Sequence, residues 1–405
     1  MNFQPAERIH RLEGPHLRAT HGDTLRALER ELEQQPAGSP FLDVTYADTH
    51  RFPPVDWALP EFSKAASGAG MTYTPYRGDA GVRAAVARNI GNLIGHELDP
   101  AAEVILTPGT QAGLYCALAT ILNSGDKVII PDPDYITSDR SVRYFDGEVL
   151  PVPLVWDAGR SPRLDLDVLR AQLSKKPKLV MFSHPNNPTG AVFTPEHVAE
   201  IAAVVAESDA LVLVDQLYCR LVYDDAPFAH FATLPGMWER TLTTFGPSKT
   251  ESLSGYRIGA AIGNPELINR IEDVMGIASL RAPAYAQHVM SRWIRDDDDY
   301  VRSRTVEYQA LRDRTVAALN EMAGIDVRVS GGSAYLFPSF AGLRATDQEV
   351  ALALKRDAGI VVNPGYQFGA GGDRHFRICF AQEELVWDTA LKRMAAVLAG
   401  FPAAA

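Results

Sequence analysis

Short apolar runs alternate with amphipathic stretches through the middle of the chain, and this alternation limits the fold more than any other feature. Each run is about as long as a buried strand, and the stretches between them repeat apolar side chains at helical spacing. Candidate strands cover 103–106, 127–130, 178–183, 210–214 and 241–245, and candidate helices cover 82–94, 111–122, 164–173 and 195–206. This order predicts βαβ units, and therefore an α/β domain with a mostly parallel sheet flanked by helices.

A second, smaller domain is predicted beyond four consecutive aspartates, Asp296 to Asp299. They begin a long charged helix that ends near Met322. Negative charge is favourable at a helix N-terminus, although a merely solvated helix start is equally compatible. The pattern then becomes strand, strand, helix, strand, strand, helix, over 326–329, 334–338, 347–357, 360–362, 375–380 and 384–398. This order is typical of an α+β domain.

The N-terminal part differs from both domains. We expect one or two polar, amphipathic helices over residues 5–35, which either cover a partner subunit or are solvated, and a short strand over 41–46. We therefore divide the 405 residues into an N-terminal arm with part of the small domain (1–54), a large domain (55–295) and a C-terminal small domain (296–405).

The charge balance and composition argue against several classes of partner. The net charge is −11 and the isoelectric point about 5.4, with no basic stripe, so we expect no nucleic-acid partner. No apolar run reaches the ~18 residues that a membrane helix needs, and residues 1–36 lack the apolar core of a signal peptide. The cysteines Cys116, Cys219 and Cys379 form no close pair. We therefore expect a cytoplasmic protein with no membrane contact, disulfide or metal ion.

One lysine has the setting of a nucleophile. The run Thr241–Phe245 ends in a Gly-Pro break, and Lys249 follows in a small polar loop, eight residues before Arg257. A lysine held at the end of a strand can be desolvated, which lowers its pKa and frees its amine to attack a carbonyl group. A loop lysine taken alone is more often solvated, so the assignment depends on the other loops.

Ligands of parallel sheets lie beyond the carboxyl ends of the strands, where two other loops carry unusual residues. Asp215 follows the apolar run 210–214, and Tyr218 stands three residues later. A carboxylate there is costly unless it is paired. It therefore needs a cation such as a protonated ring nitrogen, or else it caps a helix or forms a structural ion pair. The turn 107–111 opens a helix, where free N–H groups favour a phosphate.

Three further features point to the same edge of the sheet. The loop 184–190 contains two prolines and two asparagines, so it is either a rigid turn or a means of presenting an amide to the crevice. Tyr135 follows another strand and either stacks on a flat ring or packs in the core. Arg257 offers a fork for a phosphate, and Arg377, in an otherwise apolar strand, offers one for a carboxylate. A surface salt bridge is the alternative for each arginine.

One cofactor meets all these demands: a flat, phosphorylated pyridine aldehyde. It needs a lysine for a Schiff base, an acid for its ring nitrogen, donors for its phenolic oxygen, a stacking aromatic ring and a phosphate cup. Candidates for every role are present, most of them in loops that follow candidate strands. The joint match predicts pyridoxal 5'-phosphate.

From about Leu42 to the C-terminal helix, the chain resembles the fold-type I pyridoxal-phosphate enzymes of the class I/II aminotransferase family. The motifs that carry the resemblance are Tyr73-Thr74-Pro75 with Gly78, Pro108-Gly109-Thr110-Gln111, Pro133-Asp134-Tyr135, Asn186-Asn187-Pro188-Thr189-Gly190, Asp215 with Tyr218, Ser248-Lys249, Gly255-Tyr256-Arg257-Ile258-Gly259 and Arg377. They are specific for cofactor and fold, and less so for the reaction, because relatives on this scaffold include lyases, cyclases and oxidases.

The resemblance implies a role for each matched residue. Lys249 is expected to hold the internal aldimine and then to move the proton between substrate and cofactor. Asp215 is expected to pair with the pyridinium, and Arg377 to bind the substrate α-carboxylate. The other implied contacts are Asn187 and Tyr218 with the phenolate oxygen, Tyr135 with the ring face, Gly109, Thr110, Gln111 and Arg257 with the phosphate, and Tyr73 with the phosphate of the other subunit.

Two positions depart from the family pattern. Gly246 stands where the family usually has a serine that contacts the phosphate, so Ser248 or Thr250 is expected to make that contact. Ala47 stands where the family often has a glycine in the substrate loop, and its methyl group would crowd the carboxylate site beside Asn187. Arg281 lies near the second arginine that aspartate-specific members use.

We expect a homodimeric aminotransferase with shared active sites, which moves an amino group between an α-amino acid and a 2-oxo acid by a ping-pong mechanism. Two alternatives remain open. One is a pyridoxal-phosphate-dependent lyase, cyclase or oxidase that tailors an amino acid, which the departures at Gly246 and Ala47 keep open. The other is a non-catalytic regulatory or binding module, which the presence of Lys249 disfavours.

Overall fold

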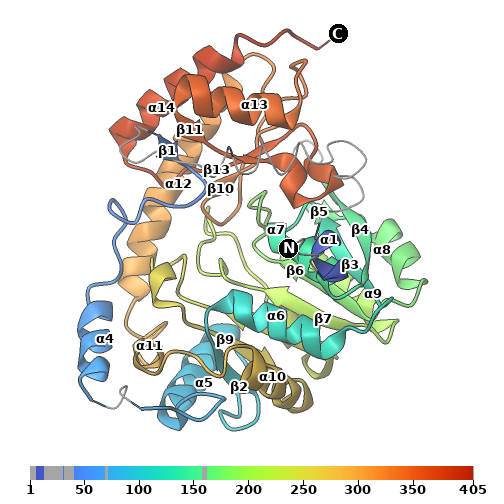
Figure 1. Cartoon of the computed structure of the whole chain (residues 1–405), viewed down its shortest axis with the longest axis vertical. Helices are drawn as coiled ribbons and strands as arrows, with labels where there is room; N and C mark the ends of the chain where they lie inside the picture. The colour runs from blue at the N-terminus through green and yellow to red at the C-terminus, as the bar shows by residue number, and fades with distance from the viewer. Residues whose placement is uncertain (1–5, 13–30, 32–40, 69–71, 157–161, 405) are drawn as a thin grey trace, which may run out of the picture.

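The computed structural model describes residues 6–12, 31, 41–68, 72–156 and 162–404. A large α/β part and a smaller α+β part lie one above the other in Figure 1, and the helix α12 (Asp298–Asn320) runs from the first toward the second. The sequence predicts this helix to within two residues at each end.

A mostly parallel sheet forms the centre of the large part, as predicted. Within the described residues its spatial order is β2 (Val104–Thr107), β9 (Gly259–Gly263), β8 (Thr241–Phe245), β7 (Leu211–Asp215), β6 (Leu179–Ser183), β3 (Lys127–Asp132), β4 (Glu148–Val155) and β5 (Arg163–Leu164). Neighbours run parallel except β9, which is antiparallel to β2 and β8, and β5, which is antiparallel to β4.

Helices cover both faces of this sheet. Val128 and Ile130 of β3 pack in a cluster with α6, α7 and α10, whereas Ile129 packs on the opposite face with α8 and α9. Successive side chains of a strand point to opposite faces, so one short apolar run serves both layers. The helices of the large part are α4 (Ala58–Ala66), α5 (Ala80–Ile94), α6 (Thr110–Ile121), α7 (Ile136–Tyr144), α8 (Leu166–Leu173), α9 (Pro195–Ala206), α10 (Pro265–Ala278) and α11 (Ala284–Val289), with the 3₁₀ turns η2 (Phe231–Thr233), η3 (Trp238–Arg240) and η4 (Ser254–Tyr256).

The strand β4 is absent from the sequence prediction because two prolines interrupt it. The carbonyl oxygens of Pro151 and Pro153 accept hydrogen bonds from Gln172 Nε2 (3.0 Å) and Asp165 N (3.1 Å) rather than from β3. In a strand the N–H and C=O of one residue point the same way. The N–H groups that these prolines lack would therefore face away from β3. On that side β4 has no long ladder of hydrogen bonds to another strand that the structure describes, so the missing donors are tolerated.

The strand β9 is also absent from the prediction, because glycines bound its short apolar run. A Cβ on Gly259 would lie 2.9 Å from Thr110 N, and one on Gly263 would lie 2.5 Å from Thr241 O. The glycines therefore let β9 fit between β2 and β8 and bring the start of α6 against it.

The small part contains short strands and longer helices. The strand β1 (Leu42–Asp43) pairs in parallel with β11 (Ile360–Val361), while β10 (Tyr335–Leu336) and β12 (Asn363–Pro364) flank β13 (Phe376–Cys379) in antiparallel fashion. Its other helices are α13 (Asp347–Ala353), which continues as the π-helix η5 (Leu354–Ala358), α14 (Glu384–Leu398), and the 3₁₀ turns η6 (Gly365–Phe368) and η7 (Ala370–Gly372).

Two predicted strands of the small part need correction. The prediction over 326–329 is wrong, because Asp326 forms only an isolated bridge with Ser339. The strand predicted over 41–46 shortens to β1, because Thr45 donates to Asp43 Oδ1 through its N–H (3.0 Å) and its hydroxyl (2.6 Å). Such an Asx turn ends the extended backbone.

The chain passes from the hydrophobic core of one part to that of the other between Phe52 and Val55. Phe52 packs in the core of the small part, whereas Val55 packs in a core of the large part with α5 and α11. Tyr218 and Leu221, which follow β7, also pack in the core of the small part, so the two parts are joined beside the sheet edge. The domain boundaries at 54 and 295 stay predictions.

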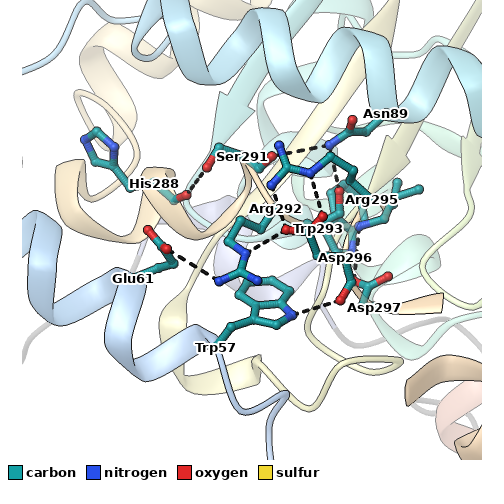
Figure 2. A network of polar contacts seen from close by, with 11 residues as sticks. Trp57, Glu61, Asn89, His288, Ser291, Arg292, Trp293, Arg295, Asp296 and Asp297 are labelled. Atoms are coloured by element: carbon teal, nitrogen blue, oxygen red, sulfur yellow. Dashed lines mark hydrogen bonds and ion pairs between the residues drawn. The ribbon is translucent and has the colours of Figure 1, made fainter. Parts of the chain in front are cut away.

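A polar network holds the chain where the large part leads into α12 (Figure 2). Trp57 Nε1 donates to Asp296 O at 3.2 Å, and the Asp296 carboxylate accepts from Arg295 Nε at 2.6 Å and from Arg292 Nε at 2.7 Å. Hydrogen bonds from Arg295, and then from Arg292, lower the pKa of Asp296 to about 2. Asp296 is therefore used in ion pairs rather than merely solvated.

The helices predicted over residues 5–35 lie largely outside the described residues. The described part includes α1 (Glu7–His10) and Arg11, which pairs with Asp146 at 3.2 Å. Among the helices that the structure describes, none combines the length and the apolar character needed to cross a membrane.

Candidate active site

The loops that follow β3, β6, β7 and β8 meet at one edge of the sheet. Tyr135, Asn187 and Lys249 lie in these loops, and Asp215 is the last residue of β7. The strands β3, β6, β7 and β8 are parallel neighbours, with Ser183 opposite Asp215 and Asp215 opposite Thr244. Their carboxyl ends therefore bring these side chains to a common crevice.

Asp215 has one carboxylate oxygen that is available to a ligand. Thr244 Oγ1 and Leu217 N each donate to Oδ1 at 3.2 Å. No residue that the structure describes donates to Oδ2. Burial raises the pKa of Asp215 to about 6, and the positive charge of Lys249 acts in the opposite direction. A carboxylate in this setting favours a cation beside Oδ2.

Lys249 is half-buried in the turn after β8. Burial raises the pKa of the Cys379 thiol to about 11, and Lys249 opposes this shift as it does at Asp215. Lys249 therefore acts electrostatically on groups of both parts, Asp215 at the sheet edge and Cys379 in β13. Lys249 forms no salt bridge with a carboxylate of the described residues, so its Nζ is available for chemistry.

Asn187 and Arg377 bind each other across the two parts. Arg377 Nη1 donates to Asn187 Oδ1 at 2.8 Å, and Nη2 donates to Asn363 Oδ1 at 2.6 Å and to Thr45 O at 3.0 Å. Since the amide oxygen of Asn187 faces the guanidinium, its amide nitrogen remains for another acceptor.

Arg377 is a buried cation whose hydrogen-bond partners are all neutral. Its guanidinium lies 4.1 Å from the centre of the Tyr335 ring and 5.0 Å from that of Phe368, and its Nε is buried without an acceptor. The ring contacts offset part of the cost of desolvation. Within the described residues no carboxylate pairs with Arg377, so the site favours an anion that matches a planar fork.

Two tyrosines complete the walls of the crevice. Tyr218 OH donates to Tyr335 OH at 3.2 Å, and burial, followed by the influence of Tyr335, raises the pKa of Tyr218 well above its usual value. Burial and then the charge of Asp215 raise the pKa of Tyr135. Both hydroxyls therefore stay protonated at neutral pH, and Tyr218 can turn its hydrogen to a ligand because the Tyr335 hydroxyl can donate to it in return.

Gly109 and Arg257 meet at the N-terminus of α6. Gly109 has φ +77° and ψ 162°, and a Cβ there would overlap Nη2 of Arg257 and lie 3.0 Å from its Cζ. Arg257 is held by a hydrogen bond from Nη1 to Ser254 O at 2.9 Å. The guanidinium and the free N–H groups of the first turn of α6 form a cup that suits a phosphate.

The hydroxyl and amide residues predicted near this cup differ in their surroundings. Thr110, Ser248 and Thr250 are buried, whereas Gln111 is half-buried and its Oε1 accepts a hydrogen bond from Thr137 at 3.0 Å. A Cβ on Gly246 would lie 3.1 Å from Thr110 Cγ2. A serine at position 246 would therefore press on the start of α6, which is a packing reason for the glycine.

Tyr73 and Arg281 contact each other rather than the residues above. Tyr73 is 80% exposed, and its ring centre lies 4.3 Å from the Arg281 guanidinium, which also lies over Tyr76 at 4.7 Å. Arg281 Nη1 donates to Thr74 O at 2.6 Å. Ala47 packs against the core of the small part.

Residues 43–393 match the family model described as aminotransferase class I and II. The chain belongs to this family. It is 30% identical over 343 residues to aromatic-amino-acid aminotransferase 2 of Thermococcus litoralis, covering 84% of this chain and 87% of that protein. It is 32% identical over 360 residues to aspartate aminotransferase of Rhizobium meliloti, covering 84% and 86%.

Solved structures agree with this assignment. A crystal structure of an aspartate aminotransferase from Rhodobacter sphaeroides superposes with a TM-score of 0.87 at 34% identity, covering 93% of this chain and 100% of that one. The predicted family and its fold-type I architecture are therefore confirmed, and the protein is an aminotransferase-family enzyme that transfers nitrogenous groups.

Three residues beside the site of this aminotransferase receive no role from sequence reasoning. Tyr335 and Asn363 belong to two-residue strands, and only the pairing of Asn363 with Arg377, and of Tyr335 with Cys379, brings them to the crevice. Asp134 does carry a sequence signal, since it is a carboxylate just beyond a buried strand, as Asp215 is at the end of one.

Proposed function

We propose that this aminotransferase binds pyridoxal 5'-phosphate and moves an amino group between an α-amino acid and a 2-oxo acid. The two substrates would occupy the same site one after the other, in a ping-pong mechanism. The observation that carries the proposal is the crevice itself. It has an available lysine, Lys249, near the acid Asp215, and a buried guanidinium, Arg377, without an anion. The family assignment supports the reaction class.

The residues present fit this cofactor. Asp215 Oδ2 suits a protonated ring nitrogen, and the cup of Gly109 and Arg257 suits the phosphate. The remaining contacts that we propose are the ring face against Tyr135, the phenolic oxygen against Asn187 and Tyr218, and further phosphate contacts from Thr110, Gln111 and Ser248.

When bound, the cofactor supplies an electron sink for the negative charge that develops at the substrate Cα. Lys249 Nζ would hold the aldehyde carbon of the cofactor and, once the substrate amine has displaced it, would act as the base that takes the proton from the substrate Cα. A cation beside Oδ2 lowers the pKa of Asp215, so its carboxyl group stays ionised. The negative charge of Asp215 in turn keeps the ring nitrogen protonated. Arg377 binds the α-carboxylate and orients the Cα–H bond toward Lys249.

We further propose a cytoplasmic homodimer with shared sites. The exposed Tyr73, packed against Arg281, presents its hydroxyl to a second subunit, where it would reach that subunit's phosphate. The three free cysteines are compatible with a reducing compartment.

A panel of amino acids tests the reaction, with the visible absorbance of the bound cofactor as the signal. Aspartate and the aromatic amino acids come first, because relatives carry their names. Conversion to the pyridoxamine form, reversed by a 2-oxo acid, supports the proposal. Release of ammonia or carbon dioxide would instead indicate a lyase, cyclase or oxidase, and an unchanged spectrum with every amino acid would indicate a binding module.

A further inference from the structure

Asp134 is a buried carboxylate that no role above uses. It lies between β3 and Tyr135, its exposed fraction is 3%, and it accepts five hydrogen bonds. Oδ1 accepts from Tyr135 N (2.7 Å) and Ser138 Oγ (3.3 Å), and Oδ2 accepts from Ser183 N (3.1 Å), Ser183 Oγ (3.1 Å) and Asn186 Nδ2 (3.0 Å). One side chain thus joins the loops that follow β3 and β6.

The hydroxyl group of Ser183 links Asp134 to Asn187. Ser183 Oγ gives its only hydrogen to Asp134 and accepts from Asn187 N at 3.0 Å. The backbone of Asn187 is therefore fixed through Ser183, while its side-chain oxygen is fixed by Arg377 at 2.8 Å. Between them, these two bonds set the direction of the free amide nitrogen.

The chemistry of the position requires a carboxylate. Only a group with two oxygens and no hydrogen can accept from five donors, whereas an asparagine would turn an NH₂ group toward N–H or O–H donors. All five donors are neutral, and burial raises the pKa of Asp134, whereas the hydrogen bonds from Ser183 and Tyr135 oppose this shift and favour the ionised form. Keeping an acid in so costly a place is explained when its five bonds position functional groups.

We propose that Asp134 is a positioning residue, which sets the stacking ring of Tyr135 and the amide of Asn187 against the cofactor at the same time. The inference rests on the proposed binding of pyridoxal 5'-phosphate. Asp134 contacts neither substrate nor cofactor in this account and acts only through Tyr135, Ser183 and Asn186.

The test compares Asp134→Asn and Ser183→Ala with Asp347→Asn in the intact protein. Asp347 is a matched control, because it is also buried and accepts two backbone hydrogen bonds, from Tyr366 N and Arg374 N at 2.8 Å each. Each variant is titrated with pyridoxal 5'-phosphate, and the visible absorbance of the bound cofactor is then followed against pH.

We expect Asp134→Asn to weaken cofactor binding about tenfold and to raise the pKa of the absorbance change by roughly one unit, because a displaced Asn187 stabilises the phenolate charge less well. Ser183→Ala should shift both in the same direction by less, which keeps the test open if Asp134→Asn fails to fold. Asp347→Asn should lower the melting temperature and change neither readout.

Asp134 and Ser183 variants that match Asp347→Asn in both readouts would overturn the inference and leave the proposed function standing. A parent protein that gives no visible absorbance with pyridoxal 5'-phosphate would instead overturn the proposed function.

Discussion

Gly109→Ala should weaken cofactor binding through two structural effects. The first is conformational: Gly109 has φ +77° and ψ 162°, a region that costs other residues about 1–3 kcal/mol. The second is steric: the new methyl group would occupy the space of Arg257 Nη2 and push the guanidinium away from the start of α6. Loss of one charge-assisted hydrogen bond to the phosphate costs about 1.5–3 kcal/mol, so affinity should fall roughly 10- to 150-fold.

The assay is titration of the apoprotein with pyridoxal 5'-phosphate, followed by absorbance. Gly95→Ala is the matched control, because Gly95 also has a positive φ, +71°, but a Cβ there would meet nothing within 4 Å. The control should lose stability and keep its affinity for the cofactor. In an Arg257→Ala background, Gly109→Ala should have little further effect on affinity. Gly109→Ala that binds the cofactor as tightly as Gly95→Ala would refute the steric reasoning.

Three further predictions concern the acid, the partner subunit and pH. Asp215→Asn should bind the cofactor but turn over about 10³-fold more slowly, ~4 kcal/mol in barrier, and a loss of only about tenfold would make Asp215 mainly structural. Tyr73→Phe mixed with Lys249→Ala subunits should recover activity relative to either homodimer, since one site of the mixed dimer receives both intact residues, and an active monomer would contradict this. Burial raises the pKa of Glu251 from 4.5 to about 8 although Arg220 Nη1, 2.6 Å from its Oε1, opposes the shift, so the folded state favours its neutral form and loses stability as pH rises through this window. The melting temperature of Glu251→Gln minus that of the parent apoprotein should therefore increase between pH 5 and pH 8, and curves that stay parallel would contradict the pKa shift.

Local sequence pattern predicts the residues that stand at strand ends. Lys249 and Asp215 follow short apolar runs that are buried in the sheet, so their place at its edge follows from the run itself. The strand β4 escapes prediction because its prolines are tolerated only where their missing N–H groups face away from the neighbouring strand.

Contacts between the two parts could not be predicted in the same way. The hydrogen bond between Arg377 and Asn187 joins residues 190 positions apart, and Asn363 reaches the same guanidinium only through the pairing of β12 with β13. Two-residue strands carry too little periodicity to reveal that pairing. The lone arginine in an apolar strand did indicate that an anion is needed, but not which neutral groups hold the fork.

Borohydride reduction tests whether pyridoxal 5'-phosphate attaches to Lys249. The protein is loaded with pyridoxal 5'-phosphate, reduced, digested and mapped by mass spectrometry, with Lys249→Ala treated in parallel. Lys355 is an internal control, because it is a buried lysine whereas Lys249 is half-buried. We expect one reduced adduct, on Lys249, and none in Lys249→Ala. An adduct on Lys355 or another lysine, or an adduct that persists in Lys249→Ala, would contradict this.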